Sequence, residues 1–315
     1  NQNGMAPPSV VDSDGDSVAD TIYSGDLQGN LWKIDISLAV PSAWSVSFSG
    51  QPLMKVADKN SVKQPITQKP LVRSHPLGAK AGVLIYVGTG RYLGFSDNSA
   101  STSQDSLYAV WDYDNNVSPV TRAKMLKQEM LTELTVGGDT EIRITTDHPI
   151  KWLADGVTLS DYGWSASIVD HGWYIDLDSA GERIASVPVL RGNTVLFSTL
   201  LPSDDPCTGG VTGWLMALNA ETGARFDTPR IDINNDGNFN EKDVTSWDDD
   251  GVASEAAASG IKSKTGIPSA PIILSRGSGQ GSSGVILTDS TGASIGGVNL
   301  SDSNAFGRQS WIQIR

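Results

Sequence analysis

The chain consists largely of short runs in which apolar and polar residues alternate, each bounded by glycine, serine, asparagine or aspartate. A period of two is typical of strands, and helical periodicity is scarce. Strands are predicted at residues 20–24, 29–36, 82–88, 106–112, 172–177, 193–201, 213–219, 285–289 and 310–314. The alanine-rich residues 252–259 are the exception and predict two turns of helix. The pattern therefore indicates an all-β fold, either a sandwich, a barrel or a propeller.

Three of the predicted strands share one motif, in which leucine is followed by a bulky residue, any residue and an aliphatic one. The motif occurs as LWKI (31–34), LYAV (107–110) and LMAL (215–218). It predicts inner strands buried on both faces, which favours propeller blades and leaves a β-sandwich as the alternative. Residues 112–131 and 227–266 lack a strand pattern and are interpreted as insertions. The remaining strands make four or five blades, too few to close a ring, and Trp32 is expected to lock neighbouring blades.

Composition narrows the classes of partner. The 315 residues include 23 basic and 36 acidic side chains, a net charge of −13. This acid excess argues against a sequence-independent hold on nucleic acid and against a polybasic hold on anionic membrane. The longest strongly apolar run, residues 83–87, is far shorter than the ~20 residues of a membrane span. The chain starts at Asn1, and we interpret it as a mature product or a fragment without its targeting signal.

Cys207 is the single cysteine, so no disulfide can form within the chain. Either it is a turn residue with no special role or it cross-links to a partner.

The first candidate for chemistry is the nine-residue loop DSDGDSVAD, residues 12–20. Its carboxylates stand at positions one, three, five and nine, and a carbonyl is available at position seven. Calcium takes six to eight hard oxygen ligands, and alternate residues of a curled loop point theirs inward. Without a cation these like charges would repel one another. The predicted ligands are Asp12, Asp14, Asp16, the Val18 carbonyl and Asp20.

A second loop, DINNDGNFNEKD at residues 232–243, has EF-hand spacing within a predicted insertion at residues 232–250. Oxygen side chains stand at positions one, three, five, nine and twelve, and Gly237 stands at position six, where such loops turn sharply. The departure is an aspartate in place of glutamate at position twelve. The predicted ligands are Asp232, Asn234, Asp236, Asn238, Asn240 and Asp243. Two Ca²⁺ sites in an all-β chain without a cysteine framework indicate a bacterial envelope or extracellular setting.

The first loop and the following GDLQGNLWKID (25–35) together resemble the C-terminal domain of PilY/PilC-type proteins at the tip of type IV pili. Further matching stretches are QPIT (64–67), VGTGRYL (87–93), residues 106–112, GWYIDL (172–177) and GRQSW (307–311). The resemblance implies one modified β-propeller domain over residues 1–315, an incomplete ring of C-terminal blades, with calcium in the nine-residue loop. The loop at 232–243 is an addition to the family pattern.

The resemblance also implies a role in pilus biogenesis, surface adhesion and twitching motility, exercised by binding and not by catalysis. The implied location is the pilus tip or cell surface, with passage through the periplasm and outer membrane during assembly. The implied partners are minor pilins and a host or abiotic surface ligand, the latter reached through an N-terminal region absent from this chain. In the family, calcium at this loop influences whether pili are extended or retracted.

Three alternatives stay open at this stage. The GNLW strand also resembles the blades of quinoprotein dehydrogenases, which stack pyrroloquinoline quinone over a tryptophan. A calcium-dependent extracellular binding module unrelated to pili is a second alternative. A hydrolase is disfavoured because His75, His148 and His171 have neither a nucleophile elbow nor metal-ligand spacing. GQGSSG at 279–284 precedes a predicted strand and is interpreted as a hairpin loop, not a phosphate cradle.

Overall fold

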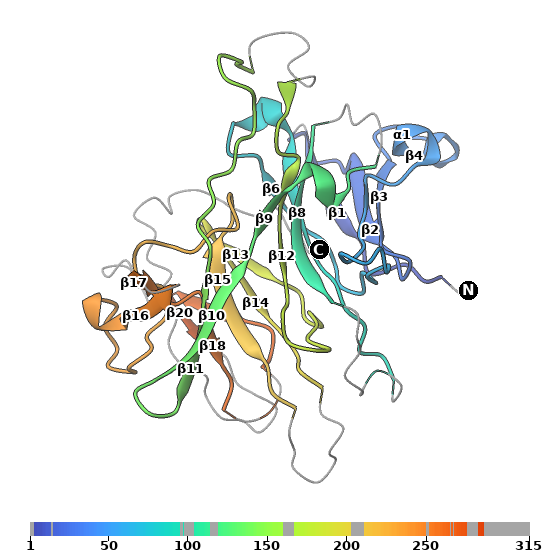
Figure 1. Cartoon of the computed structure of the whole chain (residues 1–315). Coiled ribbons are helices and arrows are strands. Elements are labelled where there is room, and N and C mark those ends of the chain that lie inside the picture. The colour runs from blue at the N-terminus through green and yellow to red at the C-terminus, as the bar shows by residue number, and fades with distance from the viewer. Residues whose placement is uncertain are drawn as a thin grey trace.

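A computed structural model describes residues 3–13, 15–94, 97, 104–113, 119–159, 167–202, 211–249, 252–264, 266, 268–275 and 283–286. In these residues the fold is almost entirely β, arranged as three large, mainly antiparallel sheets with two smaller hairpins (Figure 1). None of the helices in these ranges has the length and hydropathy that a membrane crossing requires.

Sheet one is the N-terminal blade. Its strands are β1 (Ser9–Val11), β2 (Thr21–Gly25), β3 (Asn30–Asp35), β4 (Ser45–Val46) and β5 (Met54–Lys55). They lie in the order β1-β2-β3-β4, and β5 also pairs with β3. Between β3 and β5 the chain forms η1 (Pro41–Ala43) and α1 (Ser47–Gly50). In α1, Phe48 and Ser49 have positive φ angles of 54° and 56°, so this short element contains a left-handed turn.

Sheet two is the middle blade. Its strands are β6 (Leu71–Ser74), β7 (Val83–Gly88), β8 (Ser106–Asp112), β9 (Leu126–Gln128) and β12 (Gly172–Asp176). Their order is β6-β7-β8-β12-β9, and the β9–β12 pair is parallel. The short helices η2 (Ala79–Ala81) and η4 (Arg122–Lys124) precede β7 and β9.

Sheet three is assembled from distant parts of the chain. Its strands are β10 (Met130–Val136), β11 (Thr140–Thr145), β13 (Val189–Arg191), β14 (Thr194–Ser198), β15 (Trp214–Asn219) and β18 (Gly260–Lys262). Their order is β10-β11-β18-β15-β14-β13. Helix η6 (Glu241–Asp243) leads into the hairpin of β16 (Val244–Asp249) and β17 (Val252–Ala257). The other hairpin joins β19 (Ile272–Ser275) and β20 (Ser283–Ile286).

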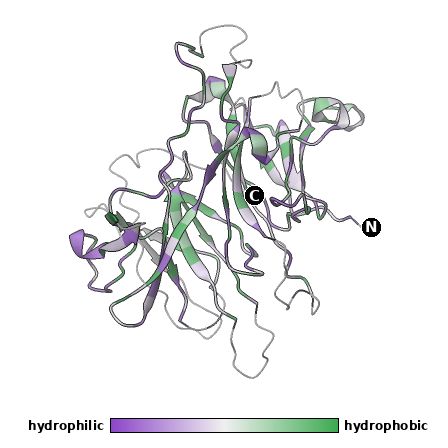
Figure 2. Cartoon of the chain, viewed as in Figure 1, coloured by the Kyte–Doolittle hydropathy of each residue, from purple (hydrophilic) through white to green (hydrophobic). Residues whose placement is uncertain are grey.

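Residue parity explains why the sheets stack face to face. On β8, Leu107, Ala109 and Trp111 pack toward sheet three, whereas Tyr108 and Val110 pack toward sheet one. Successive strand residues point to opposite faces, so a strand covered on both sides must be apolar throughout. Figure 2 shows the hydrophobic residues concentrated on these inner strands. Burial of each large side chain contributes about 1.5–3 kcal/mol, and this double-sided packing holds the blades together.

The strand predictions are confirmed for β2, β3, β7, β8, β12, β14 and β15, and the repeated motif lies on an inner strand of each large sheet. β8 and β15 are buried on both faces, whereas β3 is only half buried. The predicted helix at 252–259 is wrong, because β17 pairs with β16 over its whole length. The segments 112–131 and 227–266 are not strandless, since they contribute β9, the start of β10, β16, β17 and β18.

The described residues form three blades, fewer than the four or five predicted, because each blade contains five or six strands. These blades do not close into a ring, which agrees with the predicted modified and incomplete propeller (Figure 1). The predicted strand at 310–314, Cys207 and most of residues 279–284 lie outside the described residues, and the single-domain assignment for 1–315 stays a prediction.

Candidate calcium loops and a buried polar network

The nine-residue loop joins β1 to β2 and is closed at its base by backbone pairing. Val11 lies opposite Thr21, and the Asp20 N–H donates to the Val11 carbonyl at 2.9 Å. Gly15 and Ser17 have φ angles of 84° and 74°, and these left-handed residues curl the chain. The strand pairing on either side therefore fixes the two ends of the loop close together.

The carboxylates of this loop turn back onto its own backbone. Asp12 accepts the N–H groups of Gly15 and Ser17 at 2.7 and 2.8 Å. Asp20 accepts both the N–H and the hydroxyl of Ser13 at 2.7 Å. Asp16 accepts the N–H of Val18 at 2.7 Å. Asp14, the fourth predicted carboxylate, lies outside the described residues.

The second loop is anchored on sheet three. The side chains of Ile231 and Ile233 pack in the cluster on the outer face of that sheet. Asp232 is 3% exposed and accepts the Gly237 N–H at 2.8 Å. Asp243 is fully buried, and its two oxygens accept the N–H groups of Ile233 and Asn240 at 3.0 Å each. The first and last carboxylates of the motif therefore pin both ends of the loop.

The middle of the second loop is exposed and polar. Asp236 accepts the Asn238 N–H at 2.8 Å, and this bond lowers the pKa of the Asp236 carboxyl, so it is ionised at neutral pH. Asn234 accepts the Asp236 N–H at 2.9 Å, and Asn240 accepts the Lys242 N–H at 2.9 Å. The side-chain oxygens of five predicted ligands therefore accept bonds within one curled segment, namely those of Asp232, Asn234, Asp236, Asn240 and Asp243.

Both loops offer oxygen donors only, which is the donor chemistry that calcium prefers. In the described part of the chain, no three His, Cys, Asp or Glu side chains converge closely enough to hold a metal by themselves. Amide and carbonyl oxygens would therefore have to complete the set of calcium ligands in the second loop. In the first loop, Asp14 and the Val18 carbonyl would have to complete it. On the chemistry of their donors, the residues fit a hard divalent cation.

His75, His148 and Trp32 make packing or hydrogen-bond contacts within the fold. His75 is buried and stacks on Trp111 with ring centroids 4.1 Å apart, and burial lowers its pKa to about 3. His148 hydrogen-bonds the Lys127 carbonyl at 3.1 Å. Trp32, expected between blades, instead donates its indole N–H to Asp26 at 2.9 Å within the β2–β3 turn.

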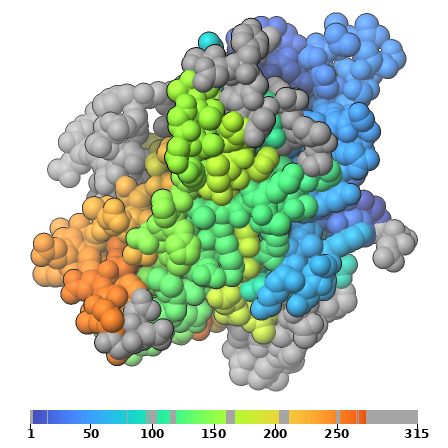
Figure 3. All heavy atoms as spheres, turned by 45° about the horizontal axis from the view of Figure 1, so that its top comes forward, coloured from blue at the N-terminus to red at the C-terminus, as the bar shows by residue number. Residues whose placement is uncertain are grey.

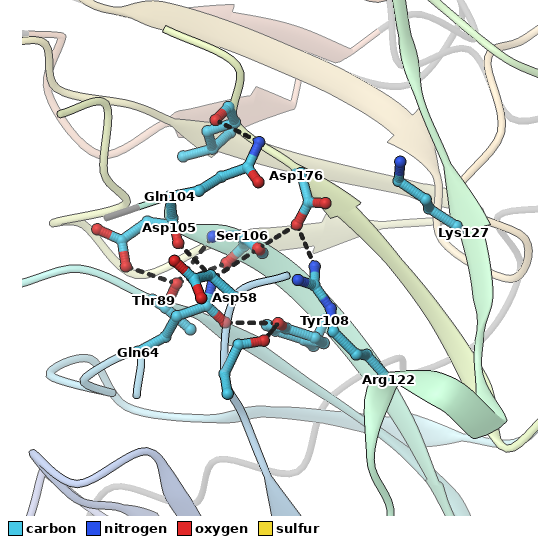
Figure 4. A network of polar contacts seen from close by, with 12 residues as sticks. Asp58, Gln64, Thr89, Gln104, Asp105, Ser106, Tyr108, Arg122, Lys127 and Asp176 are labelled. Carbon is cyan, nitrogen blue, oxygen red and sulfur yellow. Dashed lines mark hydrogen bonds and ion pairs between the residues drawn. The ribbon is translucent and has the colours of Figure 1, made fainter. Parts of the chain in front are cut away.

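A buried polar network between sheets one and two has no counterpart in the sequence predictions (Figure 4). Gln64 donates to the Ser106 hydroxyl at 2.8 Å and accepts from the Tyr108 hydroxyl. Ser106 in turn donates to Asp176 at 2.6 Å, and Asp176 forms an ion pair with Arg122. The network thus ties the segment after β5 to β8, β12 and η4.

Asp105 lies beside this network in an unfavourable environment for a charge. It is 7% exposed, and its carboxylate accepts a hydrogen bond from the Thr89 hydroxyl at 2.9 Å. Burial, with a further contribution from the negative charge of Asp58, raises the pKa of the Asp105 carboxyl to about 6. Figure 4 shows Asp58, Asp105 and Asp176 grouped around Ser106. Only tertiary structure gathers these residues, so no local motif could have revealed them.

Comparison with known proteins agrees with this fold. The family model described as the PilY1 beta-propeller domain matches residues 1–140. The crystal structure of the Pseudomonas aeruginosa PilY1 C-terminal domain superposes with a TM-score of 0.74 at 26% identity, covering 94% of this chain and 60% of that one. The chain carries a PilY1-type β-propeller domain.

Two curated relatives of this PilY1-type domain are named for type IV pilus biogenesis. The type IV pilus biogenesis factor PilY1 of P. aeruginosa strain UCBPP-PA14 is 33% identical over 290 residues, covering 79% of this chain and 25% of the relative. A PilY1 homolog of Xylella fastidiosa is 33% identical over 233 residues, covering 70% of this chain and 14% of the relative. The chain therefore spans a quarter or less of the length of these curated relatives.

Proposed function

We propose that this chain is the calcium-binding propeller portion of a type IV pilus biogenesis factor that acts by binding and not by catalysis. The observation that supports it best is the closed β1–β2 loop, with Asp12 and Asp20 curled inward at its two ends. The relatives named type IV pilus biogenesis factor PilY1 supply the pilus context. In this proposal the chain reaches the cell surface or pilus tip through the periplasm and docks there on minor pilins.

Calcium in this proposal fixes the two loops to the blades that hold them. The first loop would bind through Asp12, Asp14, Asp16, Asp20 and the Val18 carbonyl. The second would bind through the oxygens of residues 232–243. A metal that binds only the folded chain stabilises it by about 2.7 kcal/mol at one hundred times its dissociation constant. A regulatory role in pilus extension, adhesion and twitching would need different calcium affinities in two states of the assembly.

Titration calorimetry of the full chain tests the calcium sites. The wild type is expected to bind two ions, Asp20→Ala one ion in the second loop, and Asp236→Ala one ion in the first. Asp155→Ala is the matched control, because the Asp155 side chain is 94% exposed and lies in neither loop. Unchanged affinity and stoichiometry in Asp20→Ala would contradict the first site. A single ion in the wild type, retained in Asp236→Ala, would contradict the second.

The pilus role is tested in the bacterium that makes this chain, with Asp20→Ala introduced into the complete protein. We expect fewer surface pili and a smaller twitching zone than with Asp155→Ala, at equal protein level by immunoblot. Normal piliation and twitching in a variant that has lost the first calcium would refute the link between this loop and pilus function. Normal piliation in a strain that lacks the whole protein would refute the biogenesis role.

A further inference from the structure

Strand β18 (Gly260–Lys262) connects two parts of sheet three. Although it is a short strand, it lies between β11 and β15 and pairs with both. Two residue pairs join it to β11 and three join it to β15. Ser259 extends the connection, because its N–H donates to the Arg143 carbonyl at 2.7 Å and its carbonyl accepts the Ala217 N–H at 2.8 Å. In the order of the described strands, the β10–β11 hairpin therefore reaches the rest of the sheet through this segment.

With so few backbone pairs, the position of β18 depends on side-chain packing. Gly260 lies so close to β15 that a Cβ there would be 2.3 Å from the Met216 sulfur. On the outer face of the sheet, one apolar cluster joins β18, its neighbouring strands and the second calcium loop. Its buried members are Ile142, Leu196, Leu215, Ala217, Ile231, Ile233, Ala258 and Ile261.

The second calcium loop and β18 therefore belong to one packing unit. Ile231 and Ile233 flank the first aspartate of the loop, and Ile261 is the central residue of β18. Figure 3 shows the orange segment that follows β15 beside the green atoms of β10 and β11. Because the buried apolar area is shared, displacement of the two loop isoleucines would remove part of the cover over Ile261.

The two ends of the loop carry buried carboxylates that have no basic partner. Asp232 is 3% exposed and Asp243 is 0% exposed. In the part of the chain that the structure describes, neither forms an ion pair with a lysine, arginine or histidine. Their hydrogen-bond donors are backbone N–H groups. Buried carboxylates are usually paired with a basic group or bound to a metal, so these two favour a cation at the loop.

The same carboxylates connect a bound cation to β18. Asp232 lies between two isoleucines of the cluster, and Asp243 accepts the Ile233 N–H at 3.0 Å. Since no three metal-binding side chains converge among the described residues, a bound ion would have to draw the exposed Asp236 toward these buried ends. The ends are held in place while the isoleucines are packed. The ion should therefore bind the packed state of the loop more tightly than a released state.

We propose that calcium in the second loop controls whether β18 stays between β11 and β15, so that the loop and the strand are released together when the ion leaves. This inference rests on the proposed function of the loop as a calcium site. Release of β18 exposes the backbone edges of β11 and β15, which can then pair with another strand. The third blade is thus the part of the domain whose integrity depends on calcium.

The test is amide hydrogen exchange of the full chain, followed by mass spectrometry in excess EDTA and in calcium. The calcium concentration is one hundred times the dissociation constant of the second loop measured by calorimetry. Peptides that cover residues 140–146 and 258–263 report the pairing of β11 with β18. If the loop and the strand open in one step, calcium should slow exchange in both peptides by about 100-fold, because it binds only the closed state.

Two matched variants assign the effect to one loop, since each removes one aspartate from one calcium loop. In Asp20→Ala, calcium should still slow exchange in both peptides by about 100-fold, whereas in Asp236→Ala it should slow exchange by less than about twofold. Equal slowing in both variants would overturn the inference. An ion bound in the second loop without slower exchange at 140–146 and 258–263 would overturn it and leave the calcium site intact. Absence of an ion from the second loop by calorimetry would overturn both.

Discussion

Replacing Asp105 with asparagine is expected to stabilise the fold at neutral pH. The folded carboxyl has a pKa of about 6 against an ordinary value of 3.8, because it is buried and faces the charge of Asp58. The difference of about 2 units corresponds to about 3 kcal/mol at about 1.4 kcal/mol per unit. Asparagine retains an acceptor for the Thr89 hydroxyl and carries no charge, so it avoids this cost.

The pH dependence follows from the direction of the shift. Because the folded pKa is raised, Asp105 does not lower the free energy of unfolding below about pH 4, where it is protonated in both states. The loss of stability grows as the pH rises from about 4 to about 6 and is complete above that. Urea unfolding should therefore show Asp105→Asn more stable than wild type by about 2–3 kcal/mol near pH 7.5, with the two equal near pH 4.

A matched substitution in the same network should have the opposite sign. Asp176→Asn makes the same chemical change but leaves the half-buried Arg122 without its ion pair. Breaking a fully buried pair lowers the free energy of unfolding by about 3–5 kcal/mol, and we expect a smaller loss for this partly exposed pair at neutral pH. A loss of stability in Asp105→Asn near pH 7.5, or the same difference at both pH values, would refute the assignment of a buried, repelled carboxylate at position 105.

Two further contrasts test the packing of the blades. Glu182→Gln breaks a fully buried ion pair with Arg143 and should cost about 3–5 kcal/mol in urea unfolding, whereas Glu133→Gln, which removes a 44% exposed partner of the same arginine, should cost less than about 1 kcal/mol; equal losses would contradict it. Gly223→Ala places a Cβ 2.4 Å from a buried tryptophan and should lower stability by about 1–3 kcal/mol more than Gly156→Ala, which has a similar φ and open space around it. Equal melting temperatures for the two alanine variants would argue against close packing at Gly223.

The sequence was sufficient to predict the class of fold and seven of the described strands, β2, β3, β7, β8, β12, β14 and β15. Alternation and the repeated leucine motif located β3, β8 and β15. The apolar pattern is complete in β8 and β15, which are buried on both faces, whereas β3 is only half buried. The prediction failed where local preference and tertiary pairing disagree. Alanines favour helix in isolation, yet Ala256 and Ala257 pair with β16, and both are buried.

The candidate sites also differ in whether the sequence alone could reveal them. The acidic loops were visible because their ligands are spaced within nine or twelve residues. The network around Ser106 was not, because Gln64, Arg122 and Asp176 are brought together only when two sheets dock. The left-handed turn at Phe48 was missed for a related reason, since no glycine stands at that position to indicate a positive φ.

The position of β18 has a consequence for how the polypeptide emerges during synthesis. This strand separates β11 from β15 in sheet three, although it follows β11 by more than a hundred residues. Until it is made, the β10–β11 hairpin and the β13–β15 meander have no neighbour to join them. The third blade therefore forms late, because β18 must pair with a strand more than a hundred residues earlier, and such long-range pairing slows folding. A nascent chain that ends before Gly260 should therefore leave the third blade in two unjoined parts.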